Sequence, residues 1–412
     1  MNEGPLIPHL FRTEYRKIVA VLCKRFGFEQ IATAEDIASD TFLTAAQTWG
    51  LKGIPPNPAA WLYNVAKNKA KNHLQRNQVF ASRVAPVLKD QAIATDEIDL
   101  SPQNINDSQL QMMFAVCHPA IPVEAQIGLS LRILCGFGID EIANAFLTSK
   151  ETINKRLFRA REKLREAKVH IGLPAPAEME ERLSAVLATI YLLFNEGYYS
   201  ISQNRTLRSE LCFEAMRLCT MLVENESTNQ PSVNALLALM CFHASRFDAR
   251  VNEQGGPVLY EEQDTSLWNT DLISKGGYFL HRASGGRQLS RYHLEAGIAY
   301  WNTQPADARE KWEHILQLYN QLLLVAYSPM AALNRTYALS KVCGKQAAIA
   351  AAEKLDLADH HFYHLLLGEL YTGIDQPKAL QHFQQALLRA KTDADRRAIQ
   401  QKMNGLDTTP EV

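Results

Sequence analysis

The sequence predicts an all-α protein. Apolar residues recur at helical spacing through almost all of its 412 residues, whereas the alternating pattern that is typical of strands is scarce. Proline and glycine fall between these amphipathic runs, as expected where helices begin and end. The length indicates two or three domains, and 47% hydrophobic residues are enough to build their cores.

Four segments follow one another along the chain. A first helical segment covers 8–83. A linker covers 84–108, and its stretch 90–107 holds five acidic residues but no lysine or arginine. A short helical module follows at 109–171. The stretch "GLPAPAEME", with its two prolines, then separates this module from a long helical region at 178–403.

The first segment contains an acidic amphipathic helix. In "TAEDIASDTFLTAAQTW", Thr33 and Asp36 have the spacing of a capping box at a helix start. Asp36 and Asp40 lie one turn apart on the side that we expect to be exposed. An ordinary helix with acids near its positive N-terminal end shows the same pattern. The apolar stripe is formed by Ile37, Thr41, Phe42, Ala45 and Trp49.

The second helix of this segment is basic. From Trp61 to Arg83 it has five lysine or arginine residues and no acidic residue. Its apolar face is formed by Trp61, Leu62, Val65 and Leu74. Its opposite face interleaves asparagine and lysine, namely Asn64, Lys67, Asn68, Lys71 and Asn72. Such side chains suit phosphates and base edges, and a solubilising surface is an equally good interpretation.

The short module predicts a helix-turn-helix. "GIDEIANAFLTSKETINKRLFRAREKLR" contains two helices joined by the turn 147–149, with Ser149 capping the second helix. The inner stripe of the second helix is formed by Ile153, Leu157, Ala160 and Leu164. Residues at the start of such a helix reach base edges in the major groove, while nearby cations hold phosphates. A helical hairpin with a basic face remains the alternative.

Together these motifs carry a resemblance. "AEDIASDTF…AAWLYNVAKNKAKNHLQR" resembles region 2 of a bacterial extracytoplasmic-function (ECF) sigma factor. The helix-turn-helix motif resembles region 4 of the same family. The resemblance covers about 8–168 and leaves out the regions between the two, as that compact family does.

The resemblance implies that the protein binds core RNA polymerase and promoter DNA and that it is not an enzyme. Core RNA polymerase would contact Asp36, Ile37, Asp40, Thr41 and Phe42. The melted −10 element would contact Asn64, Lys67, Asn68, Lys71, Asn72, His73 and Arg76. The duplex −35 element would contact Lys150, Glu151, Thr152, Asn154, Lys155, Arg156, Arg159 and Arg161.

The long C-terminal region resembles a helical repeat. In "HLLLGELYTGIDQPKALQHFQQALLRA", small residues let two helices approach and aromatic residues fill the space between them, as in a tetratricopeptide (TPR) repeat. These residues are Gly368, Tyr371, Ala379, Phe383 and Ala386. Dispersed motifs across 182–388 resemble the helical extension of one ECF sigma-factor group. This implies a regulatory extension that docks on regions 2 and 4 or recruits an unknown regulatory protein.

An enzyme in the C-terminal region is the weaker interpretation. Glu196, Asp264 and His293 supply polar groups, and His360 and His364 are one turn apart like a pair of metal ligands. A zinc hydrolase motif requires a glutamate directly after the first histidine, and this sequence has none there. It also lacks a phosphate-binding loop and a nucleophile motif. We expect buried hydrogen-bonded links between helices instead, with no metal, cofactor or catalytic residue.

The cysteines and the net charge bear on the compartment and on the binding partners of the protein. The seven cysteines lack CxxC spacing and lie mostly in apolar contexts, which indicates reduced thiols in a cytoplasmic protein. We expect no signal peptide and no membrane contact. The formal net charge of −1 does not indicate a partner, so nucleic-acid binding requires a local concentration of cations. A helix-turn-helix repressor or activator fused to a TPR-like scaffold remains the alternative function.

Overall fold

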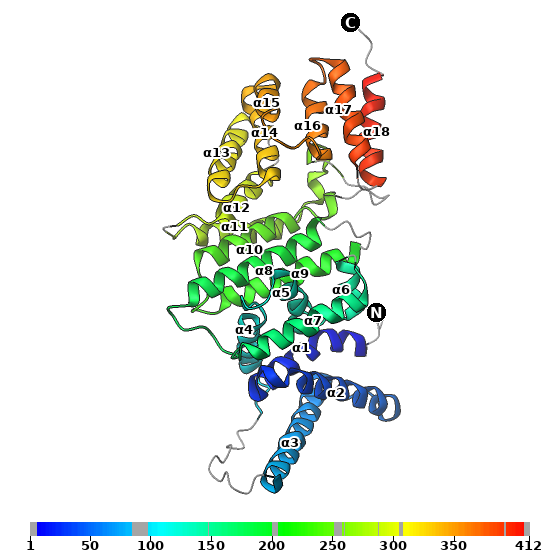
Figure 1. Ribbon diagram of the computed structural model, residues 1–412, viewed down its shortest axis with the longest axis vertical. Helices are drawn as coiled ribbons and strands as arrows, with labels where there is room; N and C mark the ends of the chain where they lie inside the picture. Colours follow the sequence, from blue (N-terminus) through cyan, green and yellow to red (C-terminus); the bar gives the residue numbers. More distant parts are fainter. Residues whose placement is uncertain are drawn as a thin grey trace. The chain divides into compact units, whose positions relative to one another are not determined.

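The structure, a computed structural model, describes residues 6–84, 98–146, 148–199, 205–250, 258, 260–286, 288–304, 308–390 and 393–407. Over these residues it contains 18 α-helices and no strand, which confirms the all-α prediction. The chain divides into two compact units, Met1–Thr228 and Asn229–Val412 (Figure 1). In the described part of the chain, no helix has the combined length and apolarity needed to cross a membrane.

The first unit contains nine of the described helices and two short helical turns. The helices are α1 (Leu6–Phe26), α2 (Ile31–Lys52), α3 (Pro58–Val84), α4 (Pro102–Val116), α5 (Val123–Leu129), α6 (Ile139–Ala145), α7 (Lys150–Glu166), α8 (Met179–Tyr199) and α9 (Arg205–Glu224). The turns are η1 (Phe28–Gln30) and the π-helical η2 (Ser130–Leu134), which continues α5. Helix α1 packs against α2, α3, α4 and η2.

Helix α2 begins earlier than the sequence predicted. It starts at Ile31, directly after the turn η1, and its N-cap residue Gln30 makes no side-chain capping bond. Thr33 therefore lies inside the helix, and the predicted capping box with Asp36 is wrong. The predicted apolar stripe is confirmed, because all five of its residues are buried. The buried Thr41 hydroxyl is satisfied by donating to the Ile37 carbonyl oxygen at 2.8 Å.

Helix α4 also begins earlier than predicted. Ser101 is its N-cap residue and accepts from the backbone N–H of Asn104, and Pro102 occupies the first turn. The predicted linker 84–108 is therefore helical over its last residues, 102–108, and its stretch 85–97 lies outside the described residues.

Helix α7 forms as predicted. The Ser149 hydroxyl accepts from the backbone N–H of Thr152 at 3.2 Å, which confirms the predicted cap. The inner stripe from Ile153 to Leu164 is buried against α5 and α6, as predicted. Helix α6 begins at a backbone-to-carboxylate bond, since the Gly138 N–H donates to Glu141 Oε2 at 2.7 Å. Leu147, in the predicted turn, lies outside the described residues.

Helices α8 and α9 belong to the first unit, although the sequence placed them in the C-terminal region at 178–403. They pack against each other, and α8 packs on α4 and α5. Three side-chain bonds fix them. Thr189 donates to Gln126 Oε1 at 2.8 Å, Arg182 to the Phe114 carbonyl at 2.6 Å, and Arg217 to the Leu134 carbonyl at 2.7 Å.

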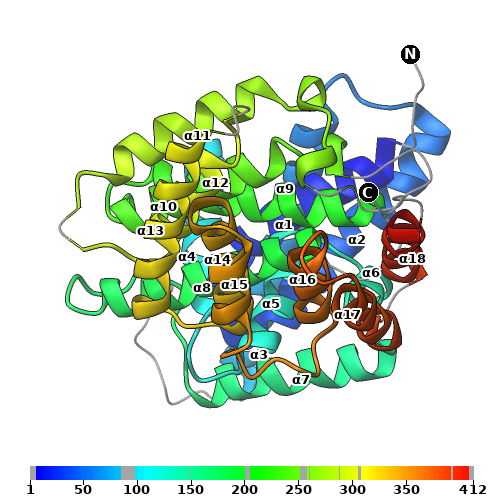
Figure 2. The same cartoon turned by 90° about the horizontal axis from the view of Figure 1, so that it is seen from above.

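The second unit contains the other nine described helices. They are α10 (Pro231–Ala244), α11 (Thr270–Ala283), α12 (Arg291–Trp301), α13 (Arg309–Val325), α14 (Pro329–Cys343), α15 (Lys345–Ala352), α16 (His361–Tyr371), α17 (Gln376–Arg389) and α18 (Asp393–Asp407). Successive helices from α12 to α18 pack on their neighbours. Figure 2 shows α16, α17 and α18 side by side.

The predicted close approach of two C-terminal helices is confirmed between α16 and α17. A Cβ atom on Gly368 would lie 2.7 Å from the Phe383 ring, so only glycine fits there. Ala379 and Ala386 are fully buried beside them, and Tyr371 closes the same core. This packing needs glycine on α16 at the point where the large Phe383 ring of α17 approaches it.

Candidate functional site

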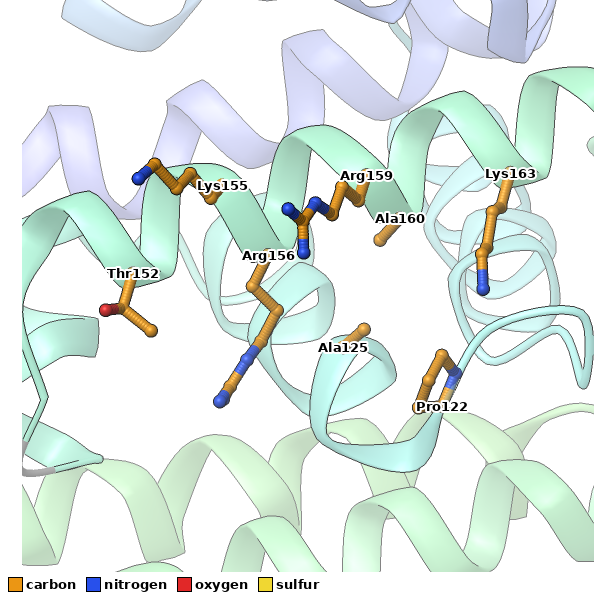
Figure 3. A pocket seen from close by; sticks show the side chains of 8 residues that line it. All are labelled: Pro122, Ala125, Thr152, Lys155, Arg156, Arg159, Ala160 and Lys163. Atoms are coloured by element: carbon orange, nitrogen blue, oxygen red, sulfur yellow. The ribbon is translucent and has the colours of Figure 1, made fainter.

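A groove with cationic walls lies between α7 and the start of α5. It encloses about 440 Å³. Its lining consists of Pro122, Ala125, Thr152, Lys155, Arg156, Arg159, Ala160 and Lys163. In Figure 3, Arg156 and Lys163 point from α7 toward the side where Pro122 and Ala125 lie. Four positive charges on one helix face, three of them exposed, give a surface suited to a polyanion.

Lys163 was missed among the predicted site residues. It stands four residues after Arg159 and seven after Arg156, which places all three on one side of a helix. This helical spacing, which is visible in the sequence, would have added Lys163 to the predicted site. The Arg156 guanidinium also lies 5.7 Å from the centre of the Phe146 ring, which fixes its position beside the groove.

The other predicted residues of α7 divide into two groups. Lys150, Glu151 and Asn154 are exposed near the start of the helix, and Lys150 pairs with Asp140 at 2.7 Å. The backbone N–H at the helix start and the Ser149 hydroxyl hold the pKa of Glu151 below its usual value. Arg161 is elsewhere. Its Nη2 donates to Glu35 Oε1 at 2.9 Å, so it pairs with α2 and is absent from the groove lining.

The basic helix α3 presents most of its predicted residues to solvent. Asn64, Asn68, Lys71, Asn72 and Arg76 are exposed, while Lys67 and His73 are half-buried. The His73 ring lies 5.8 Å from the Phe26 ring, centre to centre.

A second hollow, of about 400 Å³, lies at the start of this face of α3. Asn64 and Lys67 border it from α3, and Ile98 to Leu100 border it from the end of the linker. Tyr63, which also lines the hollow, donates to Glu14, and burial together with this carboxylate raises the pKa of Tyr63. The described end of the linker therefore lies beside the predicted −10 residues.

The exposed face of α2 contains only some of the residues that were predicted to contact core RNA polymerase. Asp36 and Asp40 are exposed as expected, and Asp40 pairs with Lys69 at 2.5 Å. Ile37, Thr41 and Phe42 are only 8%, 0% and 5% exposed, because they pack inward. In this arrangement they are not accessible to a partner.

Two leucines that the sequence analysis left out complete this face of α2. Leu43 is 56% exposed and Leu51 is 88% exposed. With Asp36 and Asp40 they follow the helical period on one side of α2. Both are apolar residues outside the predicted inner stripe, and this pattern in the sequence would have indicated an exposed apolar surface.

Three of the polar groups considered for catalysis, Asp264, His293 and His364, make local contacts. Asp264 Oδ1 accepts from the Ser266 N–H at 2.9 Å. His293 contacts the Ser290 hydroxyl at 2.8 Å and the Ala283 carbonyl at 3.2 Å. Burial raises the pKa of Glu196. His364 Nε2 lies 2.8 Å from the Ala358 carbonyl oxygen, and its Nδ1 lies 3.1 Å from His382 Nδ1, so both ring nitrogens of His364 are engaged away from His360. Among the described residues, no group of three or more histidine, cysteine or acidic side chains is placed to hold a metal ion.

Two stretches of the chain match known protein families. Residues 10–79, which correspond to α1–α3, match the family described as Sigma-70 region 2. Residues 182–284 match a family of unknown function, DUF6596. An uncharacterized protein of Rhizobium meliloti (strain 1021) is 31% identical over 390 residues, which are 93% of this chain and 92% of that protein. The chain belongs to the family of that protein.

This chain thus joins an N-terminal sigma region 2 to a DUF6596 extension. The RNA polymerase sigma-H factor of Pseudomonas aeruginosa is 28% identical over 146 residues, 32% of this chain and 72% of that protein. The ECF RNA polymerase sigma-E factor of Escherichia coli (strain K12) is 26% identical over 166 residues, 37% of this chain and 82% of that protein. These matches show a distant relationship to ECF sigma factors. No solved structure matches.

Proposed function

We propose that this protein is an ECF-type sigma factor, which binds core RNA polymerase and directs it to promoters. The observation that carries the proposal is sigma region 2 at 10–79, folded so that α2 exposes an acidic and apolar face while α3 exposes a basic one. The protein acts in the cytoplasm, binds without a cofactor and catalyses no reaction, because the polymerase performs the chemistry.

Core RNA polymerase binds the exposed face of α2. Asp36 and Asp40 attract basic residues of the partner, and Leu43 and Leu51 supply apolar area that is buried on binding. The charges steer the encounter, while the leucines account for most of the affinity. Ile37, Thr41 and Phe42 are buried behind this face, and the Phe42 ring contacts the Phe11 ring on α1 at 5.1 Å, centre to centre.

Promoter DNA binds two surfaces. The exposed asparagine and lysine residues of α3, together with His73 and Arg76, take the melted −10 strand, since amide groups reach base edges and cations hold phosphates. Helices α6 and α7 act as region 4 and take the duplex −35 element. Lys150, Glu151, Asn154 and Lys155 at the start of α7 face the bases, and the cationic groove holds the backbone.

The extension, with its TPR-like packing of α16 and α17, regulates this activity by docking within the chain or by recruiting a regulatory protein. The alternative function, a helix-turn-helix repressor or activator on a TPR-like scaffold, would use the same groove of α7.

In-vitro transcription with purified core polymerase tests the proposal. A sigma factor gives promoter-dependent transcripts, and Lys155→Glu with Arg159→Glu removes dependence on the upstream element while polymerase binding is kept. Lys354→Glu, an exposed charge reversal in the second unit, is the control. Tight binding of duplex promoter DNA by the protein alone, with no effect on transcript initiation by core polymerase, would instead support the alternative.

A further inference from the structure

Two arginines in the described part of the chain are almost completely buried, and their surroundings differ. Arg16 and Arg246 are each 7% exposed. Arg16 Nη1 pairs with Glu214 Oε2 at 2.8 Å. The guanidinium of Arg246 forms neither a hydrogen bond nor an ion pair within the described residues, and its buried Nε–H is unsatisfied. Because a buried charge is costly unless it is paired, Arg246 is placed to take an anion.

The surroundings of Arg246 favour a cation only weakly. Arg246 stands just beyond α10, whose C-terminal carbonyl groups attract positive charge. Its guanidinium carbon lies 5.3 Å from the centre of the Tyr260 ring, on the short helical turn η4 (Tyr260–Glu262). A cation–π contact and a helix terminus together contribute less than the burial of a guanidinium costs. These two contacts orient Arg246 but do not replace a carboxylate like that of Glu214.

A second unsatisfied polar atom lies next to Arg246. Trp268, directly after the turn η5 (Thr265–Leu267), is 8% exposed, and its Nε1–H has no acceptor among the described residues. The backbone places it there, because the Asn269 N–H donates to the Ser245 carbonyl oxygen at 2.8 Å. Trp268 and Arg246 therefore flank one backbone hydrogen bond, and both can donate.

A third unsatisfied atom, an acceptor, belongs to the same loop. Gln263 Oε1 is buried without a donor among the described residues, while Nε2 of this side chain donates to the Val258 carbonyl oxygen at 3.4 Å. The backbone N–H of Gln263 lies 3.4 Å from the carbonyl oxygen of Tyr260, the residue whose ring Arg246 covers. Buried polar atoms are nearly always hydrogen-bonded, so three unsatisfied atoms at one junction indicate a bound polar molecule.

The electrostatics of this junction select the charge of that molecule. Burial holds the pKa of His243 well below its usual value, and the charges of Arg246 and Arg250 lower it further. An added cation is therefore unfavourable here, whereas an anion is favourable. The donor that Gln263 Oε1 requires is then a neutral hydroxyl rather than an ammonium group.

We propose that Arg246, Trp268 and Gln263 form a binding site for a small hydroxycarboxylate. The carboxylate pairs with the forked guanidinium of Arg246 and accepts from Trp268 Nε1–H, and the hydroxyl donates to Gln263 Oε1. All three residues lie within 182–284, the stretch that matches the family of unknown function. The inference goes beyond the proposed function and does not depend on polymerase binding.

Ligand-observed NMR titration of the full-length protein with glycolate, the smallest hydroxycarboxylate, tests the site. We expect saturable binding below about 50 mM, a range that includes the roughly millimolar Kd within reach of five heavy atoms. Acetate, which lacks the hydroxyl, should bind at least about threefold more weakly, because Gln263 Oε1 then stays unsatisfied. Arg246→Met should abolish binding, and Trp268→Phe should weaken it. Arg282→Met, which removes an exposed arginine of α11, should keep the wild-type Kd.

Urea unfolding without ligand separates binding from a structural role. Arg246→Met should keep or raise the urea midpoint, because it removes a buried unpaired charge and keeps an apolar chain of similar length. A lower midpoint would mean that the protein itself satisfies this charge, and it would overturn the site. So would the absence of saturable glycolate binding, or equal binding by Arg246→Met. Tighter binding of glycine or inorganic phosphate than of glycolate would contradict the assignment to hydroxycarboxylates.

Discussion

Glu35 on α2 accepts a hydrogen bond from Arg161 on α7 at 2.9 Å, although the two residues are 126 positions apart in the chain. Arg161 stands only two residues after Arg159, which lines the cationic groove. Two neighbouring arginines on one helix therefore have different environments. Arg159 is exposed, whereas Arg161 joins α7 to α2 within the first unit.

Glu35→Gln should destabilise the protein. The substitution leaves Arg161 and Arg132, which are both mostly buried, without their shared carboxylate. We expect the free energy of unfolding to fall by about 1–3 kcal/mol. Urea unfolding followed by circular dichroism measures it. The exposed Glu29→Gln should change it by less than about 0.5 kcal/mol. Equal stability of the two variants would mean that the ion pair contributes nothing.

Asp36→Arg should weaken binding to core RNA polymerase. The change places a cation on the face of α2 that we propose meets basic residues, so like charges repel. We expect the Kd to rise at least tenfold, which corresponds to about 1.4 kcal/mol or more. Biolayer interferometry with immobilised core polymerase measures it. Glu224→Arg makes the same change in charge on α9 and should bind as the wild type does. Unchanged affinity of the Asp36 variant would remove α2 from the interface.

Lys163→Ala should weaken binding of the −35 duplex without changing sequence preference. Lys163 lines the groove opposite the start of α5. We propose that it holds a phosphate of the DNA backbone. Losing one such contact should lower the slope of log K against log salt by about 1. Fluorescence anisotropy with the holoenzyme at several salt concentrations measures this slope. Lys168→Ala, an exposed residue beyond the end of α7, serves as the control. An unchanged slope would place the DNA backbone elsewhere.

Gly368→Ala should destabilise the second unit. The new methyl group would lie 2.7 Å from the Phe383 ring, inside van der Waals contact, so α16 and α17 must move apart. Overpacking of this kind costs about 1–3 kcal/mol. Gly277→Ala in α11 is a matched control, because nothing lies within 4 Å of its added methyl group. Chemical denaturation should separate the two, and equal stability would contradict the tight packing.

Stability should fall in mild acid because of a histidine pair in the second unit. His364 Nδ1 and His382 Nδ1 are 3.1 Å apart, and His364 Nε2 lies 2.8 Å from the Ala358 carbonyl oxygen. The Nε2–H of His364 donates to the Ala358 carbonyl oxygen. Neutral His364 therefore has no proton on Nδ1, which can only accept. The Nδ1–H of His382 is then the donor in the bond between the two rings. Protonating His364 at Nδ1 removes the acceptor and breaks this bond, and a charge on His382 would repel a charge on His364.

The sign of this effect follows from the pKa shifts. Burial lowers the pKa of His364 and of His382, and Arg389 and Lys378 lower them further, while Glu353 opposes the shift at His382. Below the ordinary value of about 6.5 the unfolded chain therefore binds more protons than the folded chain, so stability falls as the pH falls. Urea midpoints between pH 7.5 and 5.5 should show a smaller decline in His382→Gln than in the exposed His281→Gln. Parallel declines would exclude the pair as the cause.

Local features of the fold were predictable from the sequence. The helical period gave the inner stripes of α2 and α7, and Ser149 gave the start of α7, because these depend on residues within one helix. The start of α2 was misplaced because the turn η1 leads the chain into the helix before Thr33. The close approach of Gly368 and Phe383 was predictable, because a small and a large residue at this spacing indicate two helices in close contact.

Long-range contacts were not predictable. Nothing in the local pattern separates Arg161 from Arg159, since only the folded position of Glu35 decides which of them is paired. Likewise, the proline-rich break before α8 suggested a domain boundary. Thr189, Arg182 and Arg217 nevertheless bond α8 and α9 into the first unit.

Binding of the full-length protein to core RNA polymerase, followed by sequencing of the transcripts made from fragmented genomic DNA, tests the central claim most directly. The account predicts a stoichiometric complex and new transcript start sites that share two upstream elements, both lost in Asp36→Arg. Failure to bind core polymerase, together with tight binding of duplex DNA by the protein alone, would contradict the account.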